Sequence, residues 1–260
     1  MAHAAAAQPQ SETPRVNEIT LDHPWEWLAR GWKDLSSAPR YSLTYGAVFT
    51  IVSYLLTLGL VYEDLFPVIP PLAAGFFLVA PLLGIGLYQI SDALERGESV
   101  RFCNAWRAWK RNDVQLSAMA VVLVMVMLVW MLAAILVFAL FYDQPVPTWD
   151  NFVAEAFLSG ESPAFLLTGI AVGGLIAAFT FMITAITVPM LMDRQTDVLT
   201  AMRTSMQAVR SNWQAMTLWA SLIVMFVGIG IVTFFLGLIV AMPLVGHATW
   251  HAYRDLVPRD

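Results

Sequence analysis

Long apolar runs constrain the fold of this chain more than any other feature. A helix of about 20 mostly apolar residues crosses roughly 30 Å of hydrocarbon. Four uninterrupted runs reach that length, at residues 42–62, 68–91, 116–142 and 163–192. The chain is 58% hydrophobic and only 13% charged, whereas a soluble domain carries about 25% charge. The sequence therefore predicts an all-α membrane protein.

A fifth apolar run, residues 214–250, is too long for one crossing. As a single helix it would measure about 55 Å, nearly twice the hydrocarbon core. We therefore expect two spans, about 213–229 and 232–254, with a turn near Gly228-Ile229-Gly230, where two glycines can relax the backbone. The prediction is six transmembrane helices arranged as three hairpins.

The distribution of charge supports an even number of spans. Lys and Arg accumulate on the cytoplasmic side of membrane proteins, and six spans place all 14 of these residues on one side. A five-span arrangement would move Arg254 and Arg259 to the other side. We therefore expect both termini to be cytoplasmic. The outer loops then carry only acidic charge, at Glu63, Asp64, Asp143, Asp150, Glu155 and Glu161.

An amphipathic pattern precedes each odd-numbered span. Apolar residues recur three or four positions apart on one helical face, with basic residues on the other face. Such helices lie at the headgroup boundary and are attracted to anionic lipid; the alternative is that they pack beneath the bundle. The predicted unit is a cytoplasmic interfacial helix followed by a hairpin, used three times, through common origin or by chance. The three patterns are Trp25, Leu28, Trp32 and Leu35; Phe102, Trp106 and Trp109; and Met202, Met206 and Val209.

The even-numbered spans share a second pattern, a proline followed by two apolar residues, at Pro81, Pro189 and Pro243. Aromatic and basic residues near the cytoplasmic ends of the spans are expected to contact the lipid interface. The residues predicted to do so are Trp25, Trp32, Trp106, Trp109, Lys110, Arg111, Trp250, Tyr253 and Arg254.

Two histidines four residues apart, His247 and His251, raise the question of a metal site. A helical H-E-x-x-H pair binds zinc, and its glutamate acts as the general base. Ala248 stands in the position of that glutamate, which excludes this hydrolase chemistry, although Asp92 or Asp255 could approach as a further ligand. The favoured alternative is that the histidines form the hydrated cytoplasmic end of the last helix. No cofactor is predicted.

A stripe of small and polar residues runs along the fourth expected span. The glycines of a G-x-x-x-G pattern permit close helix approach, and threonines can hydrogen-bond across a helix interface. The alternative is a polar lining for a conduit. Because no ionisable residue lies deep in any expected span, packing is favoured over transport. The stripe consists of Gly169, Gly173, Ala177, Thr180, Thr184 and Thr187.

The remaining sequence contains no catalytic Ser/His/Asp grouping, no phosphate-binding loop and no basic tract for nucleic acid. We therefore predict that the protein is not an enzyme. Residues 1–20 are expected to be a flexible tail, and residues 21–257 a six-span transmembrane domain. Cys103 is the single cysteine, so no internal disulfide forms.

Three segments, PWEWLARGWKDL, PLLGIGLYQISDALERG and GLIVAMPLVGHATWHAYRDLV, resemble a family of predicted bacterial integral-membrane proteins over residues 17–257. The resemblance implies the bacterial inner membrane, and it carries no activity and no site residues. More loosely, the layout is similar to membrane domains fused to some glycerophosphodiester phosphodiesterases.

The function expected from these features is the organisation of membrane lipid, or of a membrane protein complex, by a non-enzymatic protein. Two alternatives stay open. One is a transporter or channel for a small neutral or lipidic solute. The other is a metal- or haem-binding accessory of a respiratory complex, using His247 and His251.

Overall fold

A computed structural model describes residues 14–101, 109–142, 151 and 162–259, and the elements assigned there are helices. The all-α prediction is confirmed for these residues. In chain order the elements are α1 (His23–Ser37), α2 (Pro39–Tyr62), the 3-10 helix η1 (Phe66–Val68), α3 (Ile69–Leu83), α4 (Ile85–Glu95), α6 (Asp113–Phe141), α7 (Pro163–Thr184), α8 (Thr187–Asp193), α9 (Val198–Ser211), α10 (Trp213–Val232) and α11 (Leu238–Leu256).

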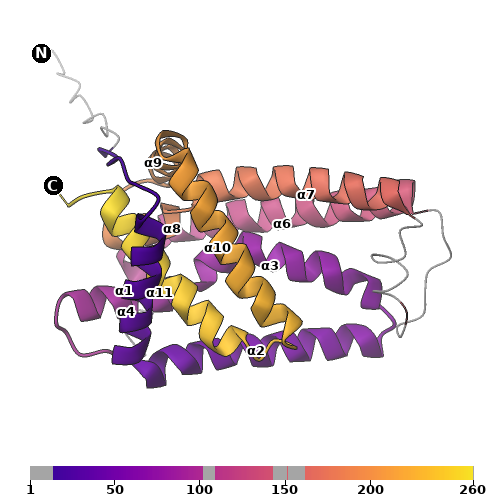
Figure 1. Ribbon diagram of the computed structural model, residues 1–260, viewed down its shortest axis with the longest axis horizontal. Helices are drawn as coiled ribbons and strands as arrows, with labels where there is room; N and C mark the ends of the chain where they lie inside the picture. The colour runs from indigo at the N-terminus through magenta and orange to yellow at the C-terminus, as the bar shows by residue number, and fades with distance from the viewer. Residues whose placement is uncertain (1–13, 102–108, 143–150, 152–161, 260) are drawn as a thin grey trace, which may run out of the picture.

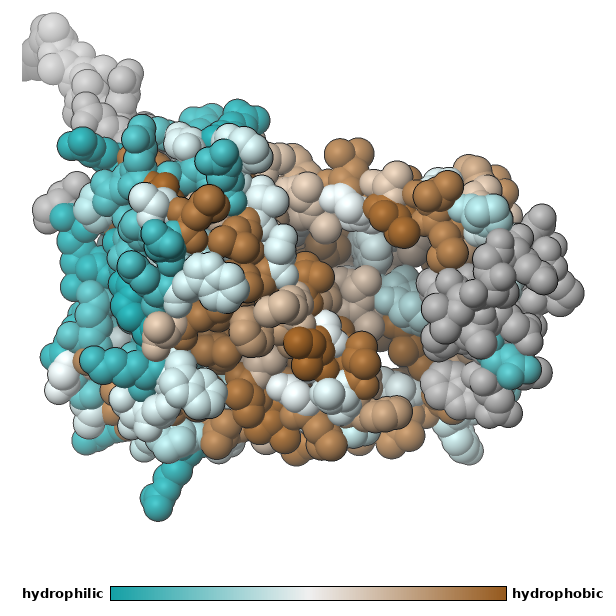
Figure 2. Space-filling model, in the orientation of Figure 1, coloured by the Kyte–Doolittle hydropathy of each residue, from teal (hydrophilic) through white to brown (hydrophobic). Residues whose placement is uncertain are grey.

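The long axes of helices α2, α3, α6 and α7 are roughly aligned, while α1 runs across them at one end (Figure 1). We call this end, formed by α1, α4, α8, α9 and the C-terminal half of α11, the polar end. Figure 2 shows hydrophilic side chains gathered there and a broad apolar surface beyond it. This distribution is that of a protein whose apolar part is immersed in lipid.

Five helical segments in the described part of the chain are long and apolar enough to cross a membrane. They coincide with the first five predicted spans, and α11 is not among them. The segments are Pro39–Tyr62, Phe66–Glu95, Asp113–Phe141, Pro163–Asp193 and Trp213–Val232.

The two ends of the described chain meet at the polar end. The backbone N–H of Asn17 donates to the carbonyl of Leu256 over 2.9 Å, and the Asn212 side chain bonds the backbone of both Asn17 and Ile19. Residues 17–19, expected in the flexible tail, are therefore attached to the bundle. Residues 1–13 of that tail lie outside the described residues.

The last apolar run forms two helices, but the turn between them lies at residues 233–237, not at Gly228-Ile229-Gly230. Phe234 and Phe235 adopt positive φ angles of 53° and 64°, and α2 holds their carbonyl groups by hydrogen bonds. Of these two glycines, Gly230 has a different role. A Cβ on Gly230 would lie 2.5 Å from the Leu238 side chain, so this glycine allows α10 to approach the start of α11.

The turn between α10 and α11 lies beside the middle of α2. Thr50 donates to the Phe235 carbonyl over 2.9 Å, and Tyr54 donates to the Phe234 carbonyl over 2.5 Å. Helix α2 continues for about eight residues beyond Tyr54, to Tyr62, which is about 12 Å. The α10–α11 hairpin therefore extends less far from the polar end than α2 does.

Two of the three proline motifs lie at breaks in long helices. Pro81 precedes the break at Gly84 between α3 and α4, and Pro189 follows the break between α7 and α8. Proline cannot donate to the helix ladder and so weakens it locally. The Tyr45 hydroxyl bonds the Leu83 carbonyl at the first break over 2.8 Å. Pro243, in contrast, lies inside the continuous helix α11.

Candidate functional site

Helix α11 contacts α1 and α2 closely through two glycines. A Cβ on Gly31 of α1 would lie 2.8 Å from the backbone nitrogen of Ala248. A Cβ on Gly46 of α2 would overlap the carbonyl group of Ile239. These two glycines allow α11 to pack in the interior of the bundle, close to α1 and α2. The sequence did not indicate this packing because neither glycine belongs to a G-x-x-x-G motif.

His247 is fully buried where α2, α4 and α11 meet. Its Nε2 lies 2.9 Å from the Ser42 hydroxyl, and its Nδ1 lies 2.8 Å from the Ser91 hydroxyl. The expectation of a hydrated helix end is therefore wrong for this residue. Because both ring nitrogens are hydrogen-bonded to protein, neither is free to bind a metal in this arrangement.

His251 has a different partner, the Asp34 carboxylate of α1, at 2.8 Å from Nε2. Burial alone would raise the pKa of Asp34, but hydrogen bonds and the nearby charge of His251 outweigh burial and lower that pKa below its ordinary value of 3.8. The two histidines thus have separate partners. Within the described residues no group of three or more His, Cys, Asp or Glu side chains is placed to hold a metal.

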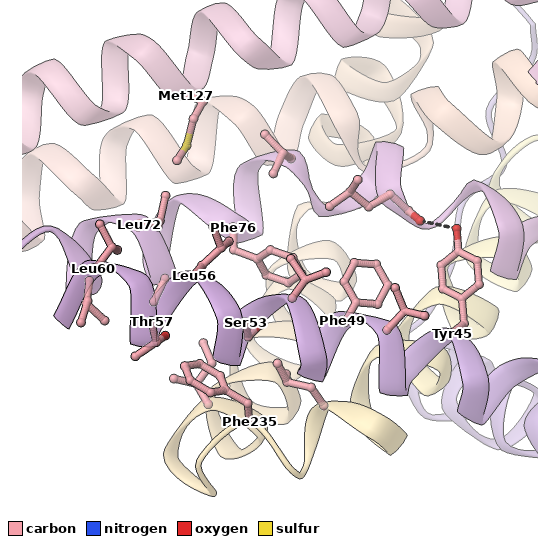
Figure 3. A pocket seen from close by; sticks show the side chains of 18 residues that line it. Tyr45, Phe49, Ser53, Leu56, Thr57, Leu60, Leu72, Phe76, Met127 and Phe235 are labelled. Carbon is pink, nitrogen blue, oxygen red and sulfur yellow. Dashed lines mark hydrogen bonds between the residues drawn. The ribbon is translucent and has the colours of Figure 1, made fainter. Parts of the chain in front are cut away.

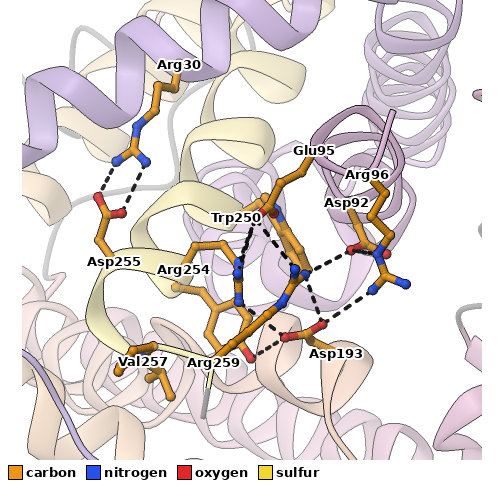
Figure 4. A network of polar contacts seen from close by, with 12 residues as sticks. Arg30, Asp92, Glu95, Arg96, Asp193, Trp250, Arg254, Asp255, Val257 and Arg259 are labelled. Carbon is orange, nitrogen blue, oxygen red and sulfur yellow. Dashed lines mark hydrogen bonds and ion pairs between the residues drawn. The ribbon is translucent and has the colours of Figure 1, made fainter. Parts of the chain in front are cut away.

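An ion-pair network joins α4, α8 and the end of α11 (Figure 4). Asp92 is 1% exposed and accepts a hydrogen bond from Arg96 Nε over 2.8 Å. Arg254 pairs with Glu95 at 3.2 Å and with Asp193 at 3.7 Å. Arg259 also lies within 4 Å of these three carboxylates, from its position after α11.

Trp250 and Tyr253 are part of this network and not of a lipid interface. Both side chains are fully buried. The Trp250 indole donates to Glu95 over 3.1 Å, and the Tyr253 hydroxyl donates to Asp193 over 2.8 Å. Their predicted contact with lipid is therefore wrong, since α4 and α8 cover them. Arg254, also predicted at the interface, is turned inward by its ion pairs.

A second connection attaches α1 to α11. Asp255 accepts a hydrogen bond from the Trp27 indole over 2.8 Å and forms an ion pair with Arg30. The sequence offered Asp92 and Asp255 as further metal ligands. Both carboxylates instead form ion pairs with arginine. Because the carboxylates of this end are paired with guanidinium and indole donors, the network fits a structural role.

The predicted interfacial residues of α1 divide between two faces. Leu28 and Leu35 are buried against the bundle, whereas Trp25 and Trp32 are 55% and 53% exposed. Leu28 and Leu35 therefore pack against the bundle, as the alternative prediction has it. Trp25 and Trp32 remain on the exposed surface. Trp109 is half-buried, and Lys110 and Arg111 are exposed, while Trp106 lies outside the described residues.

The small-residue stripe of α7 packs at one end and lines a cavity at the other. A Cβ on Gly173 would lie 2.9 Å from the Trp130 ring of α6, whereas Gly169 has space beside it. The three threonine hydroxyls donate to carbonyl groups four residues earlier on the chain. Thr187 also reaches the Ala201 carbonyl of α9 at 3.3 Å. Ala177, Thr180 and Thr184 line a cavity.

That cavity, of about 450 Å³, lies beside the two helix breaks, and we call it the broken-helix cavity. The residues that line it lie between positions 76 and 88 in α3 and α4, between 177 and 185 at the end of α7, between 217 and 227 in α10, and between 242 and 249 in α11. Val209 of α9 also lines it.

A larger cavity, of about 560 Å³, separates α2 from α3, and we call it the α2–α3 groove (Figure 3). Tyr45 lies at one end, Leu60 at the other and Phe76 between them. Val48 and Leu56, which also line it, are each about half exposed, so the groove opens to the outside of the bundle.

Together, the apolar helical body, the charged end and the apolar cavities define an integral membrane protein with several candidate spans. Residues 68–193, from α3 to α8, match the model of a family described as predicted integral membrane protein (DUF2189). The resemblance found in the sequence is confirmed there, while the C-terminal GHATWHAYRDLV segment lies outside the match. No curated protein and no solved structure matches the chain.

Proposed function

We propose that this chain is a non-enzymatic protein of the bacterial inner membrane that organises lipid by holding a hydrocarbon chain in the α2–α3 groove. The observation that carries the proposal is the shape and lining of this groove. From Tyr45 to Leu60 it follows α2 for about 22 Å, which exceeds the roughly 15 Å of one hydrocarbon leaflet. Its lining is almost entirely apolar.

The position of the groove also supports this function. It lies between α2 and α3, both within candidate spans, and its open side is formed by half-exposed aliphatic side chains. An apolar groove in contact with a bilayer is filled by hydrocarbon, because water gains no polar partners there. Lipid retained in such a groove would fill the space that α2 and α3 leave beside the ring contact of Phe49 with Phe76.

In the proposed orientation, the polar end and both termini face the cytoplasm. The described Lys and Arg residues lie in the helices of the polar end, in the segments that flank these helices, or at the start of α2, as the positive-inside rule requires. The six predicted spans become four long crossings, by α2, α3–α4, α6 and α7–α8, and a shorter α10–α11 hairpin. This hairpin enters from the cytoplasmic side and turns beside the middle of α2.

The test is a pair of neighbouring substitutions on α3. Ala73 lines the groove, whereas Ala74 is exposed on the outside of the helix. Native mass spectrometry of the full-length protein in mild detergent would count the lipids retained by each variant. Ala73→Phe is expected to retain one lipid fewer than the wild type, and Ala74→Phe the same number. Equal lipid counts in both variants would exclude the groove as the binding site.

A second candidate function, transport of a small neutral or lipidic solute, is favoured by one observation. Thr180 and Thr184 line the broken-helix cavity with Ala177, and broken helices form the substrate sites of many transporters. Replacing both threonines with valine should then abolish uptake of the solute in vesicles while the unfolding temperature is unchanged. Uptake that persists in this double variant would remove the transport function.

A further inference from the structure

Tyr88 gives the broken-helix cavity a hydrogen-bond donor in an otherwise apolar region. The residue lines the cavity and is 3% exposed, yet its hydroxyl has no hydrogen-bond partner among the described residues. Among the described residues, the fully buried side-chain polar atoms without a hydrogen-bond partner belong to Ser162 and Arg254. The Tyr88 hydroxyl is not one of these atoms, so it retains accessible surface and faces open space.

Three other hydroxyl groups that line the cavity already donate hydrogen bonds within the protein. Thr180, Thr184 and Thr249 each donate to a carbonyl of their own helix, at 2.7 to 2.8 Å. Trp219 resembles Tyr88, because it lines the cavity at 1% exposure and its indole N–H has no partner in the described residues. A buried donor without a partner is unfavourable, so these groups favour a ligand that brings an acceptor oxygen.

The depth of Tyr88 indicates which acceptor this is. Asp92, in the ion-pair network, lies one helical turn further along α4, about 6 Å away along the axis. In the opposite direction the cavity is lined by Phe76 of α3 and Val227 of α10. Tyr88 therefore lies between the charged layer and the apolar layer. In a bilayer, the ester carbonyl groups of glycerolipids occupy this level, between headgroups and hydrocarbon.

We propose that the broken-helix cavity binds a glycerolipid whose acyl ester carbonyl accepts a hydrogen bond from the Tyr88 hydroxyl. The attached hydrocarbon chain lies along the apolar wall toward Phe76 and Val227. The headgroup lies toward the charged polar end. This site and the α2–α3 groove share Phe76 as a wall residue, but the ligand of this site is selected by the Tyr88 hydroxyl, which does not line the groove.

The experiment compares two phospholipids that differ only in the carbonyl oxygens. Full-length protein in mild detergent is titrated with diester phosphatidylglycerol and with its diether analogue of equal chain length, and binding is measured by native mass spectrometry. The wild type is expected to bind the diester about fivefold more tightly, the effect of one net hydrogen bond. Tyr88→Phe should abolish this preference without abolishing binding.

Two controls isolate the contact. Tyr54→Phe also removes one hydroxyl, but that hydroxyl donates to the Phe234 carbonyl outside the cavity, so the ester preference should remain. Ala73→Phe fills the α2–α3 groove and should likewise leave the preference unchanged. Loss of the preference in Ala73→Phe would assign it to the groove and overturn the inference, whatever the total number of lipids bound.

A spectroscopic measurement on the wild type needs no variant to fold. With a diester lipid carrying ¹³C at its carbonyl carbons, isotope-edited infrared spectra should show a carbonyl band at lower frequency in the bound lipid than in detergent alone. The inference is overturned by equal affinities for diester and diether, by a preference that survives Tyr88→Phe, or by an unshifted carbonyl band. Displacement of the diester by a decyl-substituted benzoquinone at lower concentration would assign the site to quinones and overturn it too.

Discussion

Replacing His247 with alanine is expected to destabilise the protein far more than replacing His251, although both residues lie on α11. The buried ring of His247 fills the space between Ser42 and Ser91, and hydrogen-bonds both hydroxyl groups. Removal of a large buried side chain costs about 2–5 kcal/mol. Each lost hydrogen bond adds about 1 kcal/mol and leaves a buried hydroxyl unpaired. The expected loss for His247→Ala is about 4 kcal/mol.

The matched variant His251→Ala loses a contact with Asp34 that is partly open to solvent. Because only 14% and 13% of the two side chains is exposed, this single hydrogen bond to a carboxylate contributes about 1.5 kcal/mol. Equilibrium unfolding in mild detergent, followed by tryptophan fluorescence, would measure both losses. A metal chelator should leave wild-type unfolding unchanged. Equal losses in the two variants, or a chelator effect that both variants abolish, would refute the structural role and restore the shared metal site.

Two further predictions concern the contacts of α11 and of Asp34. Gly46→Ala should destabilise the protein by about 2 kcal/mol in the same unfolding assay, because its Cβ would overlap the Ile239 carbonyl group. Gly59→Ala on the same helix meets no atom within 4 Å, so a loss as large there would contradict this reason. Because the pKa of Asp34 is lowered in the folded protein, its contribution to stability is present above pH 3.8 and is lost as the pH falls through the lowered value. Asp34→Asn should flatten the stability profile in that acidic range, and an unchanged profile would exclude this contribution.

The helices of the apolar body could be predicted because hydropathy is a local property. The runs at residues 42–62 and 116–142 need no knowledge of neighbours to be assigned as helices in lipid. The division of the last run into two helices followed from its length alone. The turn was misplaced because the sequence offered Gly228 and Gly230, while hydrogen bonds from α2 hold a turn at Phe234 and Phe235.

The polar end was poorly predicted because long-range contacts decide it. Trp250, Tyr253 and His247 follow an apolar run, which is where residues of the lipid interface commonly occur. Their burial depends on α1, α4 and α8, which come from distant parts of the sequence. Pairing of Asp92 with arginines from three segments cannot be read from spacing along one helix.

The candidate site was missed for a related reason. Tyr88 has no partner at helical spacing and no motif around it, so no local pattern indicates a hydrogen-bond donor in an apolar cavity. The threonine stripe of α7 did indicate one wall, since Thr180 and Thr184 line that cavity. The cavity exists because side chains of α3, α4, α7, α10 and α11 leave a space between them, and no local sequence pattern indicates that space.

An experimental structure of the full-length protein in lipid nanodiscs would show directly whether a hydrocarbon chain lies between α2 and α3. We expect elongated density parallel to α2, running beside the ring contact of Phe49 with Phe76 and ending near Leu60. Closure of the groove between Phe76 and Leu60 by side chains of α2 and α3, with no density between them, would exclude a bound hydrocarbon chain.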